Sequence, residues 1–171
     1  MKKRGQVWVE TMIYTLVAFA LIAAVLFFVK PKVEEIRDQT LIEQSIEVMK
    51  YFDATILDLS QSVSGNKREI EVGIKKGKLL IDGENDLISF EIKSRYEYSE
   101  PGETISEGTL NVSTEKVGDE NTITISKNYS NYNLTFNSAE ESKTISASST
   151  PYKIFVSNKG GSPVVIDFEI E

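Results

Sequence analysis

The feature that most constrains this chain is a run of 19 consecutive residues without a charge, which spans positions 11–29. As an α-helix with a rise of about 1.5 Å per residue, the run would be roughly 28 Å long, about the hydrocarbon thickness of a bilayer. It is apolar all round, whereas a core helix of a soluble protein normally keeps one polar face. Lys30 and Lys32 close its far end. The sequence therefore predicts a membrane-spanning helix near the N-terminus.

Three interpretations of this segment remain open. A secretory signal peptide would be removed after the apolar run, but its apolar core is usually about 7–15 residues long. The motif Ala18-Phe19-Ala20 has the form of a cleavage site, yet it lies in the middle of the run. An uncleaved signal anchor would keep the whole chain, with three cations before the span and two after it placing the body outside. A prepilin-type signal would instead be cut on the cytoplasmic side, before the run, which then stays in the mature protein.

The residues before the run favour the prepilin interpretation, because they combine a basic cluster, a small residue and a carboxylate. In order, they are Lys2, Lys3, Arg4, Gly5, Gln6 and, at the edge of the run, Glu10. This order resembles the type IV prepilins in their archaeal form, which carry a class III signal peptide. Trp8 and Tyr14 depart from the family pattern, since a small residue and a leucine are common at these places. The resemblance covers about 30 of the 171 residues.

The resemblance implies that a prepilin peptidase recognises the basic leader, residues 1–5, and cuts between Gly5 and Gln6. A carboxylate in or near hydrocarbon costs several kcal/mol unless it is paired. The new α-amine of Gln6, which would exist only after cleavage, is a suitable partner for Glu10. In pilins this pairing is thought to join neighbouring subunits, so the resemblance implies that Gln6 and Glu10 act in assembly. The alternative for Glu10 is a solvated position at headgroup level near the basic cluster.

Residues 31–64 predict an amphipathic helix that continues the apolar helix of residues 6–30. Its apolar positions mostly recur every three or four residues, and they are 33, 36, 42, 46, 49, 52, 56, 59 and 63. The acidic residues, Asp38 among them, lie largely off this stripe. Pro31 is expected to kink or interrupt the helix, and Gly65 with Asn66 to end it. The stripe can pack on the chain's own β domain, on the same helix of other subunits, or in a two-stranded coiled coil.

From residue 68 onward the apolar residues recur with a period of two, which is typical of half-buried β-strands. The apolar residues of this part include Ile70, Val72, Ile74, Leu79, Leu80, Ile81, Ile88, Phe90, Ile92, Tyr96, Tyr98, Leu110, Val112, Ile123, Ile125, Leu134, Phe136, Ile145, Ile154, Phe155, Val156, Val164, Ile166, Phe168 and Ile170, and the alternating ones are expected to form the core. Turns are expected at 76–77, 82–85, 118–121 and 158–161. This pattern predicts eight or nine short antiparallel strands in a head of residues 65–171.

The predicted fold class is therefore α+β. A long N-terminal helix, with a hydrophobic transmembrane half and an amphipathic upper half, precedes an all-β antiparallel, sandwich-like head. The polar stretch 99–150 is the part of the head in which strands are hardest to place from sequence.

Composition excludes several kinds of chemistry. The chain has no cysteine and no histidine, which excludes disulfides, metal sites built from Cys or His, and histidine-based catalytic triads. The net charge is −7, and three of the 19 cations lie before Gly5, so the acidic remainder argues against nucleic acid as a partner. Asp82, Glu84 and Asp86 cluster at a turn, where solvated acids are favoured over a weak Ca²⁺ site. We expect no catalytic residues, no metal and no cofactor, and hence no enzyme.

The polar part of the head contains three N-glycosylation sequons, which lie together in a stretch of 25 residues. Their acceptor asparagines are Asn111, Asn128 and Asn133. Their closeness suggests a glycosylated outer surface, and the alternative is a set of polar loops that contain sequons by chance.

These observations predict a structural subunit of a type IV pilus-like surface filament. The expected partners are membrane lipid, other copies of the chain, the prepilin peptidase and the pilus assembly machinery. The chain would be a single-pass membrane protein with its C-terminal domain outside, and extracellular after assembly. The alternative is a membrane-anchored surface β domain that does not polymerise, either an adhesin or an accessory, stator-like pseudopilin.

Overall fold

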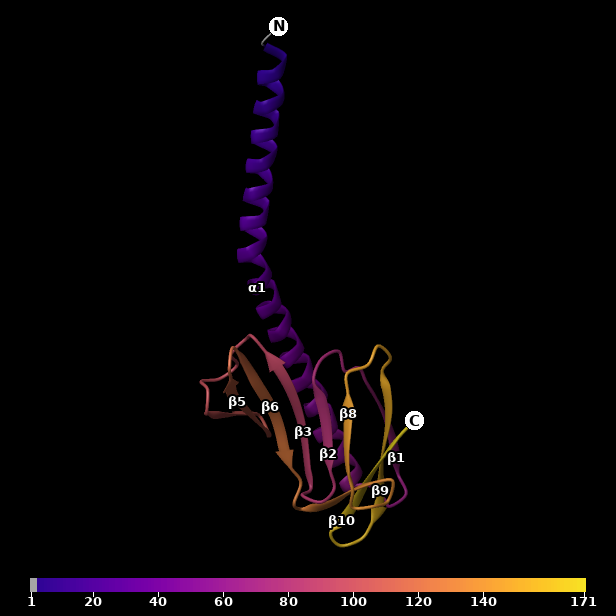
Figure 1. Ribbon diagram of the computed structural model, residues 1–171. Coiled ribbons are helices and arrows are strands. Elements are labelled where there is room, and N and C mark those ends of the chain that lie inside the picture. The colour runs from indigo at the N-terminus through magenta and orange to yellow at the C-terminus, as the bar shows by residue number, and fades with distance from the viewer. Residues whose placement is uncertain (1–2) are drawn as a thin grey trace. The chain divides into compact units, whose positions relative to one another are not determined.

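The computed structural model describes the backbone of residues 3–171 and the side chains of residues 7–171. One long helix, α1 (Lys3–Ser60), is followed by ten strands (Figure 1). The chain divides into two compact units, Met1–Arg37 and Asp38–Glu171, so the division falls inside α1. The sequence placed the start of the head at residue 65. The boundary lies earlier because the second part of α1 belongs to the same packed unit as the strands.

The strands of the second unit form two sheets. The strands are β1 (Lys67–Val72), β2 (Lys78–Asp82), β3 (Leu87–Ser94), β4 (Thr104–Glu107), β5 (Leu110–Val117), β6 (Glu120–Asn128), β7 (Tyr132–Phe136), β8 (Ser142–Ser146), β9 (Tyr152–Gly160) and β10 (Val164–Ile170). The four-stranded sheet has the order β1-β9-β10-β7, and the six-stranded sheet the order β4-β5-β6-β3-β2-β8. The fold class is α+β, as predicted, with a β-rich head.

All strand pairs but one are antiparallel. The exception is the pair β7 and β10, which run parallel with Leu134 opposite Ile166 and Phe136 opposite Phe168. The purely antiparallel prediction was wrong at this edge of the four-stranded sheet. After β7 the chain crosses to the other sheet to form β8 before it returns, so β10 can approach β7 in the same direction. A strand with one buried face has the same alternating pattern in both arrangements, so the sequence does not distinguish them.

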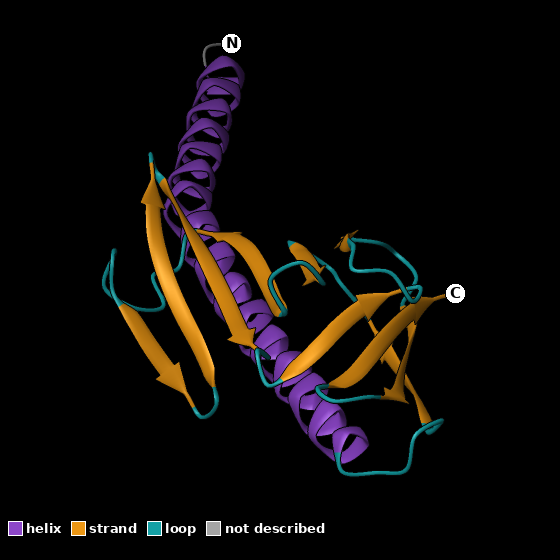
Figure 2. Ribbon diagram, turned by 90° about the horizontal axis from the view of Figure 1, so that it is seen from below, coloured by secondary structure: helices purple, strands orange, loops and turns teal. Residues whose placement is uncertain are grey.

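The core of the second unit is built from both sheets and from one face of α1. On the helix, six residues of the predicted stripe are buried, namely Ile42, Ile46, Met49, Phe52, Ile56 and Leu59. The ring of Phe52 lies 6.4 Å from that of Phe168 on β10, centroid to centroid. Figure 2 shows strands on either side of this part of α1. The amphipathic stripe is therefore used, over these six residues, to pack on the chain's own β domain.

The stripe is not buried at its two ends. Val33 and Ile36 are each 56% exposed, and Val63 lies beyond the helix and is also exposed. Val33 and Ile36 belong to the first unit. An apolar stripe read from sequence thus covers two environments, one buried and one exposed.

Asp38 lies at the start of the second unit, and its burial differs from the sequence-based expectation. We expected it among the acidic residues off the buried stripe, but only 6% of it is exposed. One carboxylate oxygen lies 2.6 Å from Nζ of Lys76, and the other accepts a hydrogen bond of 2.9 Å from the backbone N–H of Arg95. The carboxylate therefore ties α1 to the segment before β2 and to the segment after β3.

The C-terminal end of α1 is held by a side chain from β9. The buried Asn158 donates its amide N–H groups to the carbonyls of Leu59, at 2.7 Å, and Ser62, at 3.2 Å. The carbonyl of Leu59 also accepts from the backbone N–H of Ser62 at 3.0 Å and from its hydroxyl at 2.7 Å, so Asn158 adds a bond from the β-sheet to those that close the end of the helix. The helix ends at Ser60, a few residues before the stop expected at Gly65. Gly65 does adopt a left-handed backbone, with φ of 95°, in the connection to β1.

Three further details differ from the sequence-based expectation. The helix is not interrupted at Pro31, which lies inside α1. The strand β9 runs through the expected turn at 158–161 as far as Gly160, so the reversal follows it. The head has ten strands rather than eight or nine. The addition is β4, an edge strand of four residues in which Ile105 is the one aliphatic side chain, too little for a periodicity.

The turn at Lys76-Gly77 is confirmed, and the structure explains why it needs glycine. Gly77 has a φ of 91°, and a Cβ there would lie 2.3 Å from the backbone oxygen of Glu91. A larger residue would strain the backbone and push β2 away from β3.

Because Phe52 fills the space between α1 and the four-stranded sheet, we expect Phe52→Ala to lower the free energy of unfolding by about 3–5 kcal/mol. Chemical denaturation of the full chain in detergent would measure this change. Tyr51→Ala is the matched control, because Tyr51 is 57% exposed on the same turn, and it should change stability by only about 0.5 kcal/mol. Equal losses in the two variants would contradict the assignment of Phe52 to the core.

We expect Asn158→Ala to lower the free energy of unfolding by about 1–3 kcal/mol, because it removes the donors that serve the end of α1. Asn158→Asp should be at least as damaging, since a carboxylate cannot donate to the carbonyls of Leu59 and Ser62 and would be buried. Chemical denaturation of the full chain in detergent would measure both changes. An unchanged denaturation midpoint in both variants would contradict the role given to Asn158.

Candidate functional site

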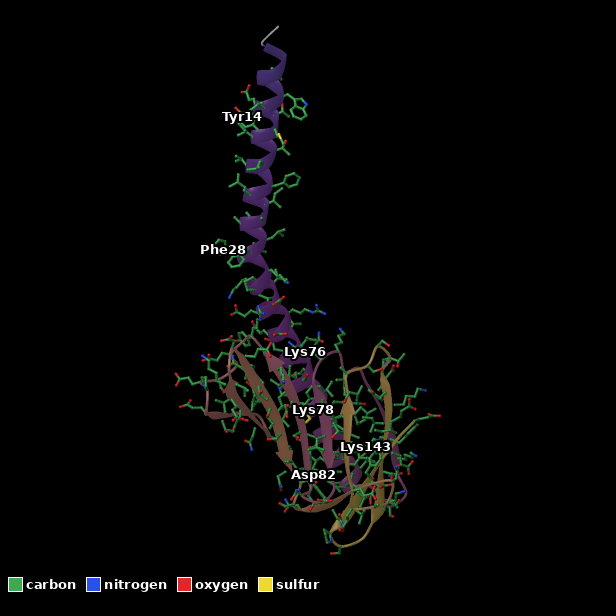
Figure 3. The ribbon with its side chains drawn as sticks, viewed as in Figure 1. Tyr14, Phe28, Lys76, Lys78, Asp82 and Lys143 are labelled. Atoms are coloured by element: carbon green, nitrogen blue, oxygen red, sulfur yellow. The ribbon has the colours of Figure 1, made fainter. Side chains whose placement is uncertain are left out.

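The candidate site is the apolar segment of α1 in the first unit. Every side chain from Val7 to Val29 is exposed, and the large apolar ones include Trp8, Met12, Phe19, Leu21, Phe27 and Phe28. Figure 3 shows the side chains of this part of α1 pointing away from the helix axis, with Tyr14 and Phe28 labelled. The segment is long and apolar enough to cross a membrane, and none of it is buried. Such a surface is stable only in lipid or against other apolar helices.

Most polar groups inside this segment are satisfied by the helix itself. The hydroxyl of Thr11 donates to the carbonyl of Val7 at 2.9 Å, and that of Thr15 to the carbonyl of Thr11 at 2.8 Å. Both hydroxyls therefore need no further partner in hydrocarbon. The Glu10 carboxylate differs, because the backbone carbonyls near it cannot donate to it.

Glu10 has one hydrogen-bond partner among the described residues. The hydroxyl of Tyr14, one turn further along α1, donates to Oε1 of Glu10 at 3.3 Å. This contact is long for a hydrogen bond to a carboxylate, which is usually about 2.5–2.7 Å. Among the side chains of residues 7–171, no cation lies beside this carboxylate, and most of its acceptor capacity is open. Tyr14, which departs from the family pattern, thus lies beside the residue on which the resemblance most depends.

The leader residues are only partly covered by the structure. Lys2 lies outside the described residues. Lys3, Arg4, Gly5 and Gln6 have backbone positions within α1, but their side chains lie outside the description. The expected cleavage between Gly5 and Gln6, and the roles of the three cations, therefore stay predictions.

The charges just beyond the apolar segment pair along the helix. Lys30 lies 4.0 Å from Glu34, and Lys32 lies 2.8 Å from Glu35, each measured from Nζ to a carboxylate oxygen. Exposed pairs of this kind contribute a few tenths of a kcal/mol. They mark the place where α1 changes from an uncharged to a charged surface.

The three sequon asparagines have different environments. Asn111 is exposed on β5 and pairs in register with Ser106 and Ser126. The Asn128 side chain is also exposed, but its amide donates to the carbonyl of Asn85 at 3.3 Å and its oxygen accepts from the N–H of Ser130 at 2.9 Å.

Asn133 is the least accessible of the three. It is half-buried on β7, and its amide donates to Oε1 of Glu140 at 3.1 Å. The hydroxyl of Thr135, which completes its sequon, is buried and donates to Oδ1 of Asp167 at 2.7 Å. A glycosyltransferase needs both the asparagine amide and this hydroxyl, and in the folded head neither is free.

The acidic turn 82–86 is organised by hydrogen bonds. Oδ1 of Asp82 accepts from the N–H groups of Glu84 and Asn85, and Oδ2 accepts from the Asn85 side chain at 2.8 Å. The hydrogen bond from the Asn85 side chain contributes most to lowering the pKa of Asp82 below its ordinary value. Oδ1 of Asp86 accepts from the N–H of Leu134. Both carboxylates therefore shape the turn, and no group of three potential ligand side chains gathers among the described residues.

Two carboxylates in the head, the half-buried Asp53 and the fully buried Asp167, have structural partners. Oδ1 of Asp53 on α1 lies within 2.5 Å of Nζ of Lys127 on β6, and Oδ2 accepts from the hydroxyl of Thr109 at 2.6 Å. Burial, with a smaller effect of Asp53, raises the pKa of the neighbouring Tyr129. Asp167 on β10 is fully buried and also lies 3.2 Å from Nζ of Lys159. Neither site could be predicted from sequence, because each is assembled from residues far apart in the chain.

Comparison with protein-family models, with curated proteins and with solved structures found no match.

In a host that N-glycosylates its surface proteins, we expect a glycan at Asn111 and none at Asn133. The glycan occupancy of Asn128 should be intermediate. Glycopeptide mass spectrometry of protein purified from that host would measure the occupancy of each site. Ser113→Ala should abolish the glycan at Asn111 and leave the fold unchanged, because Ser113 lies on the outer face of β5. Occupancy at Asn133 equal to that at Asn111 would contradict the accessibility order.

Proposed function

We propose that this protein is a structural subunit of a type IV pilus-like surface filament. The observation that carries the proposal is the segment of α1 that is apolar over its whole circumference, unburied, and bordered by the Glu10 carboxylate, which no cation of residues 7–171 pairs. The resemblance of the first 30 residues to the archaeal prepilins supplies the remaining steps. A prepilin peptidase would cut between Gly5 and Gln6, and the mature chain would wait in the membrane until the assembly machinery takes it up.

The proposed mechanism is the transfer of the apolar helices from lipid into the centre of a filament, with the β-rich heads as its coat. In water, burying a large apolar side chain is worth about 1.5–3 kcal/mol. Lipid already supplies most of this gain to the membrane-bound subunit. The net gain on assembly must therefore come from helix packing, from a charge pair at Glu10 and from energy supplied by the machinery.

In this mechanism Glu10 pairs with the α-amine of Gln6 from a neighbouring copy. The Tyr14 hydroxyl is a weak partner, so it keeps the carboxylate oriented without satisfying its charge. Pairing would replace this contact by a charge-assisted hydrogen bond, which is about twice as strong as a neutral one. The carboxylate thus favours assembly only after the leader has been removed.

The second candidate is a membrane-anchored surface protein that does not polymerise. The packed head favours it to the extent that the core is complete without a second copy. The two candidates share a single-pass topology with the head outside, and neither involves catalysis or nucleic acid. They differ in the state of the N-terminus and in the presence of fibres.

The proposal predicts that the mature protein begins at Gln6. Intact-mass measurement of the protein from the membrane fraction and from sheared filaments would test this directly. A chain that retains the basic leader in both fractions would favour the anchored surface protein instead.

The proposal also predicts that Glu10→Ala is processed normally but yields about tenfold fewer fibres, the equivalent of about 1.4 kcal/mol lost per contact. Electron microscopy and the amount of sheared protein would measure the yield. Glu120→Ala, which removes an exposed carboxylate from the head, is the control and should leave the yield unchanged. Normal fibres from the Glu10 variant would remove the role of this carboxylate.

A further inference from the structure

The six-stranded sheet of the second unit has two open ends. β4 (Thr104–Glu107) forms one end and β8 (Ser142–Ser146) the other, and no described strand pairs with the outer edge of either. Figure 1 shows β8 and β5, the neighbour of β4, at opposite sides of this sheet. Edge strands are commonly protected by proline or by a β-bulge. Neither strand contains proline, and each pairs with its inner neighbour without a shift of register, so both edges can accept another strand.

On β8, every second residue directs its backbone N–H and C=O away from the sheet. The N–H of Gly83 donates to the carbonyl of Glu141, just before β8, at 3.3 Å. Hydrogen-bonded and non-hydrogen-bonded pairs alternate along an antiparallel ladder, so Thr144 and Ser146 face outward. The carbonyl of Ser146 accepts from the hydroxyl of Tyr152 at 3.1 Å and keeps a second lone pair. Thr144 is exposed, so its outward groups face solvent.

The backbone of β4 shows the same alternation. Glu107 and Leu110 are paired across a two-residue turn, and the residues on either side of such a turn exchange both backbone hydrogen bonds. Ser106 and Thr104 therefore direct their backbone groups away from β5, and both residues are exposed. Between them, Ile105 packs against the core on the inner face of the sheet.

The two edges run in opposite directions. Each neighbouring pair in the order β4-β5-β6-β3-β2-β8 is antiparallel, so five reversals separate β4 from β8. The β4 edge of a second copy, with its inner face on the same side, therefore meets β8 of the first copy as an antiparallel neighbour. A chain cannot join its own two edges in this way, because four strands lie between them.

One register suits the inner faces and the backbones of both strands. Ile145 is the buried residue of β8, and Ile105 is the residue of β4 that packs against the core. Placing Ile145 opposite Ile105 of a second copy keeps both side chains on the inner face. It also places Thr144 opposite Ser106, so the outward backbone groups of the two edges can bond to each other.

The same register brings a cation opposite a carboxylate. Among the described residues Lys143 on β8 has no carboxylate partner, and its Nζ lies 5.6 Å from the centre of the Phe136 ring. It faces Glu107 of the second copy, which accepts from the hydroxyl of Tyr98 at 3.1 Å and lies 4.0 Å from Nζ of Lys50. An opposite-charge pair across two strands is favourable.

The surroundings of Glu107 leave room for this additional cation. Glu107 borders a groove of about 800 Å³, and the other charged residues that line it are Glu43, Glu47, Lys50 and Lys75. The groove thus holds three carboxylates and two cations. Lys143 of the second copy would balance the one negative charge in excess.

Two exposed carboxylates flank the paired strands, and neither meets a like charge in this register. Glu103, before β4, falls opposite Ala147, and Glu141, before β8, falls opposite Thr109. Pairing of two β4 edges is less favourable, because the corresponding register sets Glu103 opposite Glu107 of the other copy.

We propose that β8 of one copy pairs with β4 of a second copy, with Ile145 opposite Ile105 and Lys143 opposite Glu107. This inference rests on the proposed function and specifies how the heads meet in the coat of the filament. Because the contact joins two different edges, it can repeat from copy to copy without closing. The twist of the sheet rotates each head relative to the one before it, so the row of heads is helical.

Cysteine cross-linking tests this contact, because the natural chain has no cysteine. In the proposed register the Cα atoms of Thr144 and Ser106 are about 5.5 Å apart, which a disulfide can span. Within one chain the two residues are separated by five strand spacings, or roughly 24 Å. Mild oxidation of sheared filaments from the full-length variant with Thr144→Cys and Ser106→Cys should therefore give a ladder of linked copies.

The matched control combines Thr144→Cys with Glu115→Cys, an exposed position on the neighbouring strand β5. No ladder is expected from this pair, and each single-cysteine variant should give at most a trace of dimer. Equal ladders from both pairs, or no ladder from the Thr144 and Ser106 pair in intact filaments, would overturn the proposal. Efficient dimers from Thr144→Cys alone would also overturn it, because they would show that like edges meet.

Proline at the same position gives an independent test. Thr144→Pro removes an N–H that points away from β2, so the bonds of β8 within its own sheet remain. Thr144→Val keeps this N–H and is the matched control. Thr144→Pro should reduce the yield of filaments about tenfold, whereas Thr144→Val should assemble normally. Chemical denaturation of both variants in detergent should give similar midpoints, which separates lost pairing from lost folding.

The failures of the two proposals are distinguishable. Filaments formed by Thr144→Pro in normal amount would overturn the pairing of β8 with β4 and leave the proposed function standing. Absence of filaments from the natural chain in its own host would instead overturn the proposed function.

Discussion

The burial of one face of α1 between the two sheets is the interaction on which the rest of the head depends. Neither sheet closes on itself, and both direct their apolar side chains into the core that contains Phe52 and its neighbours on the helix. At 25 cal/mol per Å² of buried apolar surface, each large side chain of this stripe contributes roughly 1.5–3 kcal/mol. Without the helix, the inward faces of the strands would be left in water.

Polar contacts fix where the buried part of α1 begins and ends. Asp38 holds its first turn to Lys76 and to the backbone after β3, and Asn158 holds its last carbonyls from β9. Between them, Asp53 joins the helix to β6 and to the connection between β4 and β5. Because each partner comes from a different strand or loop, these contacts set the register of the helix against both sheets as well as its stability.

The same helix has two apolar surfaces with different partners. The stripe from Ile42 to Leu59 packs on strands of the same chain, whereas the surface from Val7 to Val29 is exposed. Membrane insertion and filament assembly are two ways of covering the second surface, and the proposed mechanism uses them in turn. Glu10 is the one charged residue between Val7 and Val29, and in the proposed mechanism its pairing favours a second copy over lipid.

How far the sequence leads can be judged from particular residues. The period of apolar residues was sufficient to place Phe52 and Ile56 on the buried face of a helix, and Ile88, Phe90 and Ile92 on the buried face of a strand. The same signal could not show that Val33 and Ile36 are more than half exposed, since spacing carries no information on where the buried part of a stripe ends. Asp38 was misplaced for a related reason, because its partners Lys76 and Arg95 are about 40 and 57 residues away.

The sequence by itself determined the elements: a continuous apolar stretch, an amphipathic helix, a series of alternating strands and the glycine-dependent turn at Gly77. These follow from local forces, namely the apolar period of each element and the backbone freedom of single residues. Only the tertiary structure decided which sheet each strand joins, that β10 runs parallel to β7, and which carboxylates are buried. Those outcomes depend on contacts between residues far apart in the chain, where burial and pairing act only after the segments have met.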